Sequence, residues 1–165
     1  MKYNIGIDLG GTNIKVGLVD EDYNIVAKAT CPTALPRPAE EIADSICETV
    51  WKALNEAKVT IDELNSIGIG TPGAASRNTG VVLYSCNLGF RNTDLRSLIG
   101  ARLGKEVYVE NDANAAAFGE VLAGAGKGYK DVVVVTLGTG VGGGKGPAAP
   151  AWHRFRQRGY HVRPQ

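Results

Sequence analysis

Cysteine is scarce in this sequence, and its three copies, Cys31, Cys47 and Cys86, lie far apart. A zinc site or the disulfide framework of a secreted domain needs cysteines in close pairs or in an even-numbered set. The spacing therefore argues against both kinds of site. We expect all three thiols to be reduced and to have structural roles.

Long hydrophobic runs are also missing. No apolar stretch approaches the length of a membrane span, and the N-terminal residues MKYNIGIDLGG lack the continuous hydrophobic region of a signal peptide. We therefore expect a protein of the cytoplasm that makes no contact with a membrane.

Acidic residues are absent after Asp131, and this absence accompanies a change of composition. Residues 1–144 carry 13 Lys and Arg against 17 Asp and Glu, a net charge of −4, whereas residues 145–165 carry 5 cations and no acid. The change predicts a boundary after Gly144. We interpret residues 145–165 as a disordered, aberrant tail rather than a nucleic-acid patch. A frameshift would explain the tail, and resequencing the coding DNA would test that hypothesis.

What the sequence does contain is an alternation of strand and helix patterns. Runs rich in β-forming residues at 3–8, 14–19 and 25–30 are separated by turn residues, which predicts three antiparallel strands. Apolar residues recur every four positions and predict a helix over residues 39–57. Further strands are expected at 66–70, 81–84, 107–110 and 132–137, and further helices at 94–103 and 113–123. The order predicts an α/β fold with helices packed on a mixed sheet.

The segment GIDLGGTNIK carries the first candidate site. A Gly-Gly-Thr turn leaves backbone N–H groups uncovered and offers a hydroxyl, Lys15 follows on the next strand, and Asp8 can hold Mg²⁺ through water. This set can bind the terminal phosphates of a nucleotide. The alternative is a tight hairpin whose glycines only supply positive φ angles.

The segment TLGTGVGGG is a second glycine loop after a strand. It contains the spacing G-x-G-x-x-G, but a dinucleotide fingerprint also needs a following helix and an acid about 20 residues further on. No acid follows Asp131, and no Gly-Lys-Ser/Thr closes either loop as it would in a Walker A motif. The dinucleotide and Walker A interpretations are therefore rejected.

The segment VENDANAAAFGE places Asn111 and Asp112 where a strand meets a helix. Either residue can be explained as an N-cap, without any catalytic role. A carboxylate held at such a junction could also orient a sugar hydroxyl and accept its proton during phosphoryl transfer. The two roles can coexist.

Taken together, four segments resemble motifs of the ROK family of sugar kinases and repressors, within the actin-like ATPase superfamily. They are DLGGTNIKVGLVD, GIGTPGAAS, VENDANAAAFGE and TLGTGVGGG, and the similarity extends over residues 2–144. The resemblance implies an N-terminal lobe of the actin-like ATPase (ribonuclease H-like) fold at residues 1–123. Residues 124–144 would begin a truncated second domain, and residues 145–165 would be the aberrant tail.

The resemblance also assigns roles to residues. It implies ATP-dependent phosphorylation of a hexose, glucose being favoured, at the 6-hydroxyl, with Asp112 as catalytic base and with Mg²⁺. The sugar-binding residues would be Gly73, Asn87, Asn111 and Asp112. The residues facing ATP and its Mg²⁺ would be Asp8, Gly10, Gly11, Thr12, Lys15, Thr136, Gly138, Thr139 and Gly140.

The family's later features have no match here: a Cys-rich zinc motif, a sugar-binding histidine and the adenine pocket. We expect the 165-residue chain to be inactive by itself. The resemblance implies a homodimer, which the truncation of this chain disfavours. The alternatives are a sugar-responsive transcriptional regulator of the same family and a noncatalytic binding fragment. Regulators of the family carry a DNA-binding segment ahead of the first phosphate motif, whereas in this sequence that motif stands at the beginning. We therefore favour the kinase over the regulator.

Overall fold

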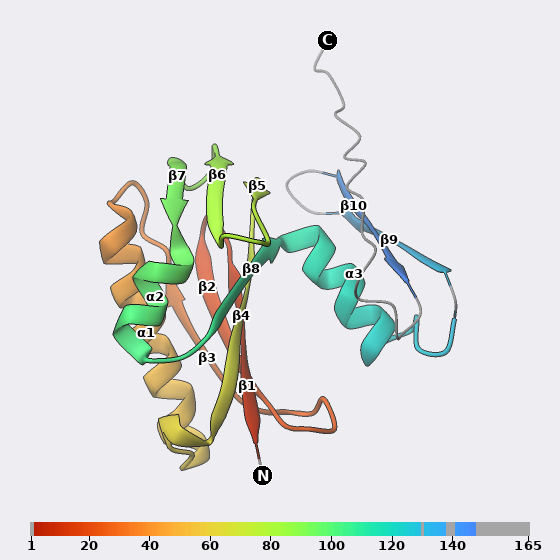
Figure 1. The fold of residues 1–165 in the computed structure, drawn as a ribbon, viewed down its shortest axis with the longest axis horizontal. Helices are drawn as coiled ribbons and strands as arrows, with labels where there is room; N and C mark the ends of the chain where they lie inside the picture. Colours follow the sequence, from red (N-terminus) through yellow and green to blue (C-terminus); the bar gives the residue numbers. More distant parts are fainter. Residues whose placement is uncertain (1, 130, 138–140, 148–165) are drawn as a thin grey trace.

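The computed structural model describes residues 2–129, 131–137 and 141–147. Its centre is a five-stranded sheet in the order β3-β2-β1-β4-β8 (Figure 1). The strands of this sheet are β1 (Tyr3–Leu9), β2 (Asn13–Val19), β3 (Ile25–Pro32), β4 (Leu64–Thr71) and β8 (Val107–Asn111). The first three are antiparallel neighbours, as the sequence predicts, whereas β4 and β8 join parallel to β1. The α/β fold with a mixed sheet is thereby confirmed.

One face of this sheet is covered by α1 (Ala39–Ala57) and α2 (Leu95–Leu103). The helix α1 has the predicted bounds, and its apolar stripe of Ile42, Ile46, Val50 and Leu54 is fully buried. Alternate residues of β1 and β2 meet this stripe, because side chains of a strand point to opposite faces in turn. The hydrophobic core therefore lies on the α1 side of the sheet.

The helix α2 begins at a capped residue and ends at a glycine. The Asp94 carboxylate accepts hydrogen bonds from the backbone N–H and the hydroxyl of Ser97, which holds the pKa of that carboxyl below its usual range. Gly104 follows the last turn with φ +63°, in the left-handed conformation that glycine favours. Asp94 and Gly104 therefore determine where α2 begins and ends.

A separate three-stranded sheet joins β5 (Ala74–Ala75), β6 (Val81–Ser85) and β7 (Phe90–Asp94) in that order. The sequence predicts β6 but neither β5 nor β7. The strand β7 reads FRNTD, in which one apolar residue precedes four polar ones, so it lacks an alternating pattern. It is formed through its pairing with β6.

The helix α3 (Asp112–Leu122) leads from β8 to a hairpin of β9 (Asp131–Leu137) and β10 (Val141–Pro147). The apolar pattern of β9 is typical of a strand buried on both faces. Val133 and Val135 are nevertheless 72% and 62% exposed. The described residues therefore do not supply the neighbours that the β9 sequence predicts.

The cysteines do not pair among the described residues. Cys47 is buried in the core, and burial raises the pKa of its thiol to about 11. Cys31 accepts a hydrogen bond from the Thr49 hydroxyl at 3.1 Å. These two thiols therefore have the structural roles expected. Among the described residues, no helix is long and apolar enough to cross a membrane.

Candidate active site

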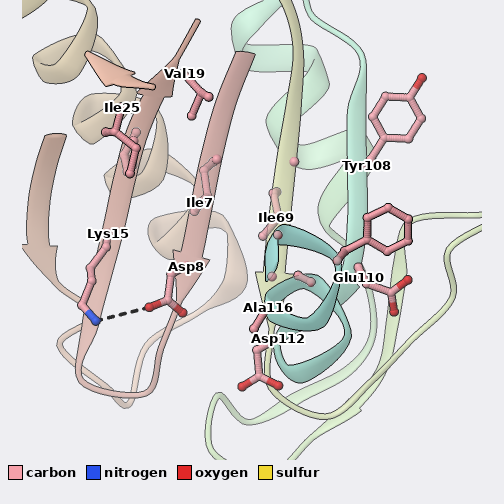
Figure 2. Close-up of a pocket in the computed structure, with 18 of the residues that line it drawn as sticks. Ile7, Asp8, Lys15, Val19, Ile25, Ile69, Tyr108, Glu110, Asp112 and Ala116 are labelled. Atoms are coloured by element: carbon pink, nitrogen blue, oxygen red, sulfur yellow. Dashed lines mark hydrogen bonds and ion pairs between the residues drawn. The ribbon is translucent and has the colours of Figure 1, made fainter. Parts of the chain in front are cut away.

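The predicted site residues converge where β1, β4 and β8 end. Asp8 on β1 is the Cα partner of Gly70 on β4, which in turn is the Cα partner of Glu110 on β8. A methyl group added at Gly70 would lie 3.5 Å from the Cα of Asp112. Figure 2 draws Asp8 and Asp112 at the same end of one pocket. Two aspartates that are 104 residues apart in sequence thus lie at the same end of the sheet.

The Gly-Gly-Thr turn is held by Thr33, which follows β3. The Thr33 hydroxyl donates to the carbonyl of Gly10 at 2.7 Å, and its N–H donates to the carbonyl of Thr12 at 2.8 Å. Gly11 and Thr12 are exposed. The turn is therefore fixed through its carbonyl groups, while the residues between them face solvent.

Lys15 and Asp8 form an ion pair of 3.3 Å beside this turn, and both side chains are more than half exposed. An exposed pair of this kind contributes little to stability. Both groups are therefore available to a ligand: the ammonium to a phosphate and the carboxylate to a cation.

At the junction of β8 and α3, the helix cap is formed by Asn111 and leaves the Asp112 carboxylate accessible. The Asn111 side-chain oxygen accepts hydrogen bonds from the N–H groups of Ala113 and Asn114 at 3.1 and 3.2 Å, so Asn111 is the N-cap. Asp112 accepts one hydrogen bond, from Ala113 at 2.8 Å, and its side chain is exposed. Capping thus explains Asn111, and Asp112 is left with an accessible carboxylate.

Gly73 lies against β6 and is hydrogen-bonded to Asn111, the N-cap of α3. Its carbonyl accepts a hydrogen bond from the Asn111 side-chain amide at 3.0 Å. Its φ is +96°, and a Cβ here would lie 2.2 Å from the carbonyl oxygen of Tyr84. Both backbone strain and close approach therefore require glycine.

We expect Gly73→Ala to lower the free energy of unfolding by about 3 kcal/mol, because strain and a backbone clash add. Urea unfolding followed by circular dichroism measures this. Gly89→Ala is the matched control, since φ is +68° there but a Cβ would meet nothing within 4 Å. The control should lose only about 1 kcal/mol. Equal losses in the two variants would show that the contact with Tyr84 has no effect.

Asn87, the remaining predicted sugar residue, lies beside the first glycine loop. A Cβ added at Gly11 would lie 3.7 Å from the Cβ of Asn87, and both residues are exposed. The structure therefore brings together Gly11 and Asn87, and separately Gly73 and Asn111, around one end of the sheet.

Glu110 and Arg77 also lie at this site, although neither was among the site residues predicted from the sequence. The Glu110 carboxylate accepts hydrogen bonds from the N–H of Asn111 at 2.9 Å and from the Asn114 amide at 3.0 Å. It also forms an ion pair with Arg77, in the loop of residues 72–80, which contains the short strand β5. Glu110 directly precedes the predicted site residues Asn111 and Asp112, and this position could have indicated it. The position of Arg77 had no comparable signal.

Arg96 on α2 attaches the same loop to β8. Its guanidinium donates to the carbonyl oxygens of Val107 at 2.9 Å, Asn78 at 2.7 Å and Arg77 at 2.9 Å. The loop of residues 72–80 is therefore bonded to β8 and the start of α3 through Asn111, Glu110 and Arg96.

The second predicted phosphate loop is only partly described. Thr136 lies in β9, but its side chain is not among the described features. Gly138, Thr139 and Gly140 lie outside the described residues. Their assignment to ATP stays a prediction.

The pocket of Figure 2 has a volume of about 1020 Å³ and extends from this site over the sheet face opposite α1. At the site end it is lined by Asp8, Lys15, Glu110 and Asp112. Among the described residues, no group of three or more His, Cys, Asp or Glu could hold a metal ion. A single carboxylate such as Asp8 suits Mg²⁺, which keeps several waters and binds through one or two carboxylates plus substrate phosphates.

The chain is similar to known proteins in sequence and in fold. The ROK family model matches residues 4–145. The glucokinase of Streptomyces coelicolor is 42% identical over 144 residues, which are 87% of this chain and 43% of that protein. The xylose repressor of Caldicellulosiruptor bescii is 30% identical over 140 residues, 85% of this chain and 35% of that protein.

Among solved structures, a ROK family glucokinase from Streptomyces griseus, in complex with glucose and AMPPNP, superimposes with a TM-score of 0.79 and 40% identity. The superposition covers 93% of this chain and 47% of that one. The chain thus spans less than half the length of the glucokinases it matches.

Proposed function

Because the chain belongs to the ROK family, we propose that it is the lobe of an ATP-dependent hexose kinase that carries the catalytic base, with glucose as substrate. The observation that carries the proposal is the junction of β8 and α3. There Asn111 provides the cap and Asp112 is exposed, with one hydrogen bond to its carboxylate. The glucokinase relatives support glucose as the sugar and ATP as the phosphoryl donor.

In the proposed reaction Asp112 is the general base. As the 6-hydroxyl oxygen of glucose bonds to the γ-phosphorus of ATP, the bond from that phosphorus to the β,γ-bridging oxygen breaks and ADP leaves. The hydroxyl proton passes to the Asp112 carboxylate. Gly73, Asn87 and Asn111 would hold the sugar by hydrogen bonds, which places the reacting oxygen near the base.

The phosphates of ATP would lie against the first glycine turn. The exposed backbone of Gly11 and Thr12 and the Lys15 ammonium can face phosphate oxygens, with Gly10 closing the turn. Asp8 would hold Mg²⁺ through water, and the ion would supply positive charge that offsets the charge of the phosphates. Residues 136 and 138–140 would form the opposite side of the phosphate site.

We infer a division of the chain that follows these roles. Residues 1–123 would be the first lobe and residues 124–144 the beginning of the second, with a composition boundary after Gly144. The hairpin of β9 and β10 would belong to that second unit, although β10 extends past the composition boundary to Pro147. ATP and glucose as substrates favour the cytoplasm.

The similarity to a xylose repressor supports a second candidate, a regulator that binds sugar without phosphorylating it. The two candidates are separated by turnover. The test joins residues 1–144 of this chain to the C-terminal portion of the S. coelicolor glucokinase that lies outside the matched region; we call this the fused protein. A kinase converts glucose and ATP to glucose 6-phosphate and ADP, whereas a regulator binds glucose without forming ADP.

We expect Gly11→Val in the fused protein to weaken ATP binding at least tenfold, which is about 1.4 kcal/mol. A branched side chain would occupy the space where the backbone must meet phosphate oxygen. Glucose affinity should fall less than ATP affinity, because a Cβ at Gly11 approaches the proposed sugar residue Asn87 only to an ordinary contact distance of 3.7 Å. Titration calorimetry measures both affinities. Unchanged ATP affinity would remove this turn from the phosphate site.

A further inference from the structure

The Glu110 carboxylate lies directly before the cap of α3 and is bonded at both of its oxygens. Oε1 accepts hydrogen bonds from the N–H of Asn111 at 2.9 Å and from the side-chain amide of Asn114 at 3.0 Å. Oε2 contacts both Nε and Nη2 of the Arg77 guanidinium. The Glu110 side chain is 20% exposed. One carboxylate thus joins the start of α3 to the loop of residues 72–80.

These partners give Glu110 a different task from that of Asp112. The two acids line the same pocket, and Figure 2 draws the Glu110 carboxylate directed away from that of Asp112. Both oxygens of Glu110 are engaged by protein donors, whereas Asp112 is exposed and accepts one hydrogen bond. Glu110 therefore acts on groups of the protein, and Asp112 is left for a substrate.

The contacts of Glu110 close a ring of covalent and hydrogen bonds. The Asn111 side-chain amide donates to the carbonyl of Gly73 at 3.0 Å. Four residues further along the same loop, Arg77 pairs with Glu110, which is covalently joined to Asn111. Two of the proposed sugar residues, Gly73 and Asn111, are members of this ring. Their relative position therefore depends on the carboxylate that closes it.

Stability alone is a weak reason for this arrangement. An acid beside the N-terminus of a helix stabilises the helix dipole, but α3 already has Asn111 as its cap and Asp112 as an acid in its first turn. An ion pair near the surface also contributes little to stability, and the Arg77 side chain is 46% exposed. The bonds of Glu110 are better explained by the residues that they position.

We propose that Glu110 is a positioning residue of the sugar and base site, with one carboxylate oxygen for each task. Through Arg77, Oε2 sets the position of the loop that carries Gly73. Through the backbone of Asn111 and the amide of Asn114, Oε1 sets the first turn of α3, from which Asp112 projects. The inference rests on the proposed function, because it takes Asp112 as the base and this loop as part of the sugar site.

Arg77→Gln in the fused protein breaks only the contact at Oε2. We expect the dissociation constant and the KM for glucose to rise about tenfold, with kcat within about twofold of the original. Glu110→Gln retains one side-chain oxygen for Asn111 and Asn114 and should have the same effect. The double substitution should be no worse than either single one, because both remove the same interaction. Arg77→Lys retains the charge and should recover most of the affinity.

Glu110→Ala breaks the contacts at both oxygens. It should raise KM as Glu110→Gln does and also lower kcat about tenfold, because a base that is no longer held in place reacts more slowly. The matched control is Asp44→Asn, which removes the ion pair of 2.6 Å between Asp44 on α1 and Arg102 on α2. That pair lies outside the site, so glucose affinity, KM and kcat should not change.

Calorimetry with glucose and steady-state kinetics measure these constants, and urea unfolding measures stability. Additive effects of Arg77→Gln and Glu110→Gln, or a normal kcat in Glu110→Ala, would overturn the proposal. A lowered urea midpoint with unchanged glucose affinity would reduce Glu110 to a structural role and would also overturn it. If the unsubstituted fused protein forms no ADP, the proposed kinase activity fails. The glucose affinities of the single and double variants then still decide whether Glu110 positions the sugar loop.

Discussion

Replacing Asp112 by Asn in the fused protein should lower kcat by about 10² or more and leave KM for glucose nearly unchanged. The asparagine side chain retains an oxygen for the N–H of Ala113 and can still bond to a sugar hydroxyl. It cannot accept the hydroxyl proton as the phosphoryl group transfers, and general-base catalysis contributes about 10²–10⁴ in rate. A loss confined to kcat identifies an interaction made only in the transition state. Steady-state kinetics with a coupled assay for ADP measure both constants.

Asn111→Asp is the matched control for this substitution, because aspartate is an equally good N-cap. The cap of α3 should survive in that variant, while the hydrogen bond from the Asn111 amide to Gly73 is lost. We therefore expect its main effect on KM. Near-normal kcat in Asp112→Asn would remove Asp112 from the proton transfer.

The 165-residue chain alone should convert no measurable glucose, whereas the fused protein should be active. Phosphoryl transfer depends on holding two substrates in line and stabilising the charge between them. The described residues supply one wall of such a site, with Asp8, Lys15 and Asp112 at its edge. The exposed valines of β9 also indicate that its neighbours are missing from the described residues.

The measurement is ADP release from the purified chain with glucose and ATP, with the Asp112→Asn form of the same chain as background. Activity of the 165-residue chain that Asp112→Asn abolishes would mean that one lobe suffices for catalysis. Calorimetry on the same preparation adds a second observation, since a lone wall should bind glucose far more weakly than the fused protein does.

The sequence predicted the elements whose local pattern agrees with their tertiary surroundings. The helix α1 carries its apolar residues on one stripe, and the structure buries that stripe completely. The strands β1, β2 and β3 are separated by short turns, which favour antiparallel neighbours. The positions of Asp8 and Asp112 followed from strand ends, and the structure brings these ends together.

Other features depend on contacts that a local pattern cannot encode. The strand β7 is mostly polar and exists through its partner β6. The ion pair of Arg77 and Glu110 joins positions 33 residues apart, so no spacing rule indicates it. The adjacency of Gly6, Gly17 and Gly68 is equally invisible in sequence, because these glycines become neighbours only through the strand register.

The bonds that tie the loop of residues 72–80 to β8 and α3 have a consequence for motion. Asn111, Glu110 and Arg96 attach this loop at three points, at Gly73, Arg77 and Asn78. Few loop conformations then remain to be lost when a sugar binds, so the entropic penalty of binding is small. A loop fastened in this way cannot act as the hinge of a closing cleft. In the proposed kinase, closure over the sugar would therefore have to come from rotation of the other lobe, while the sugar-side wall stays rigid.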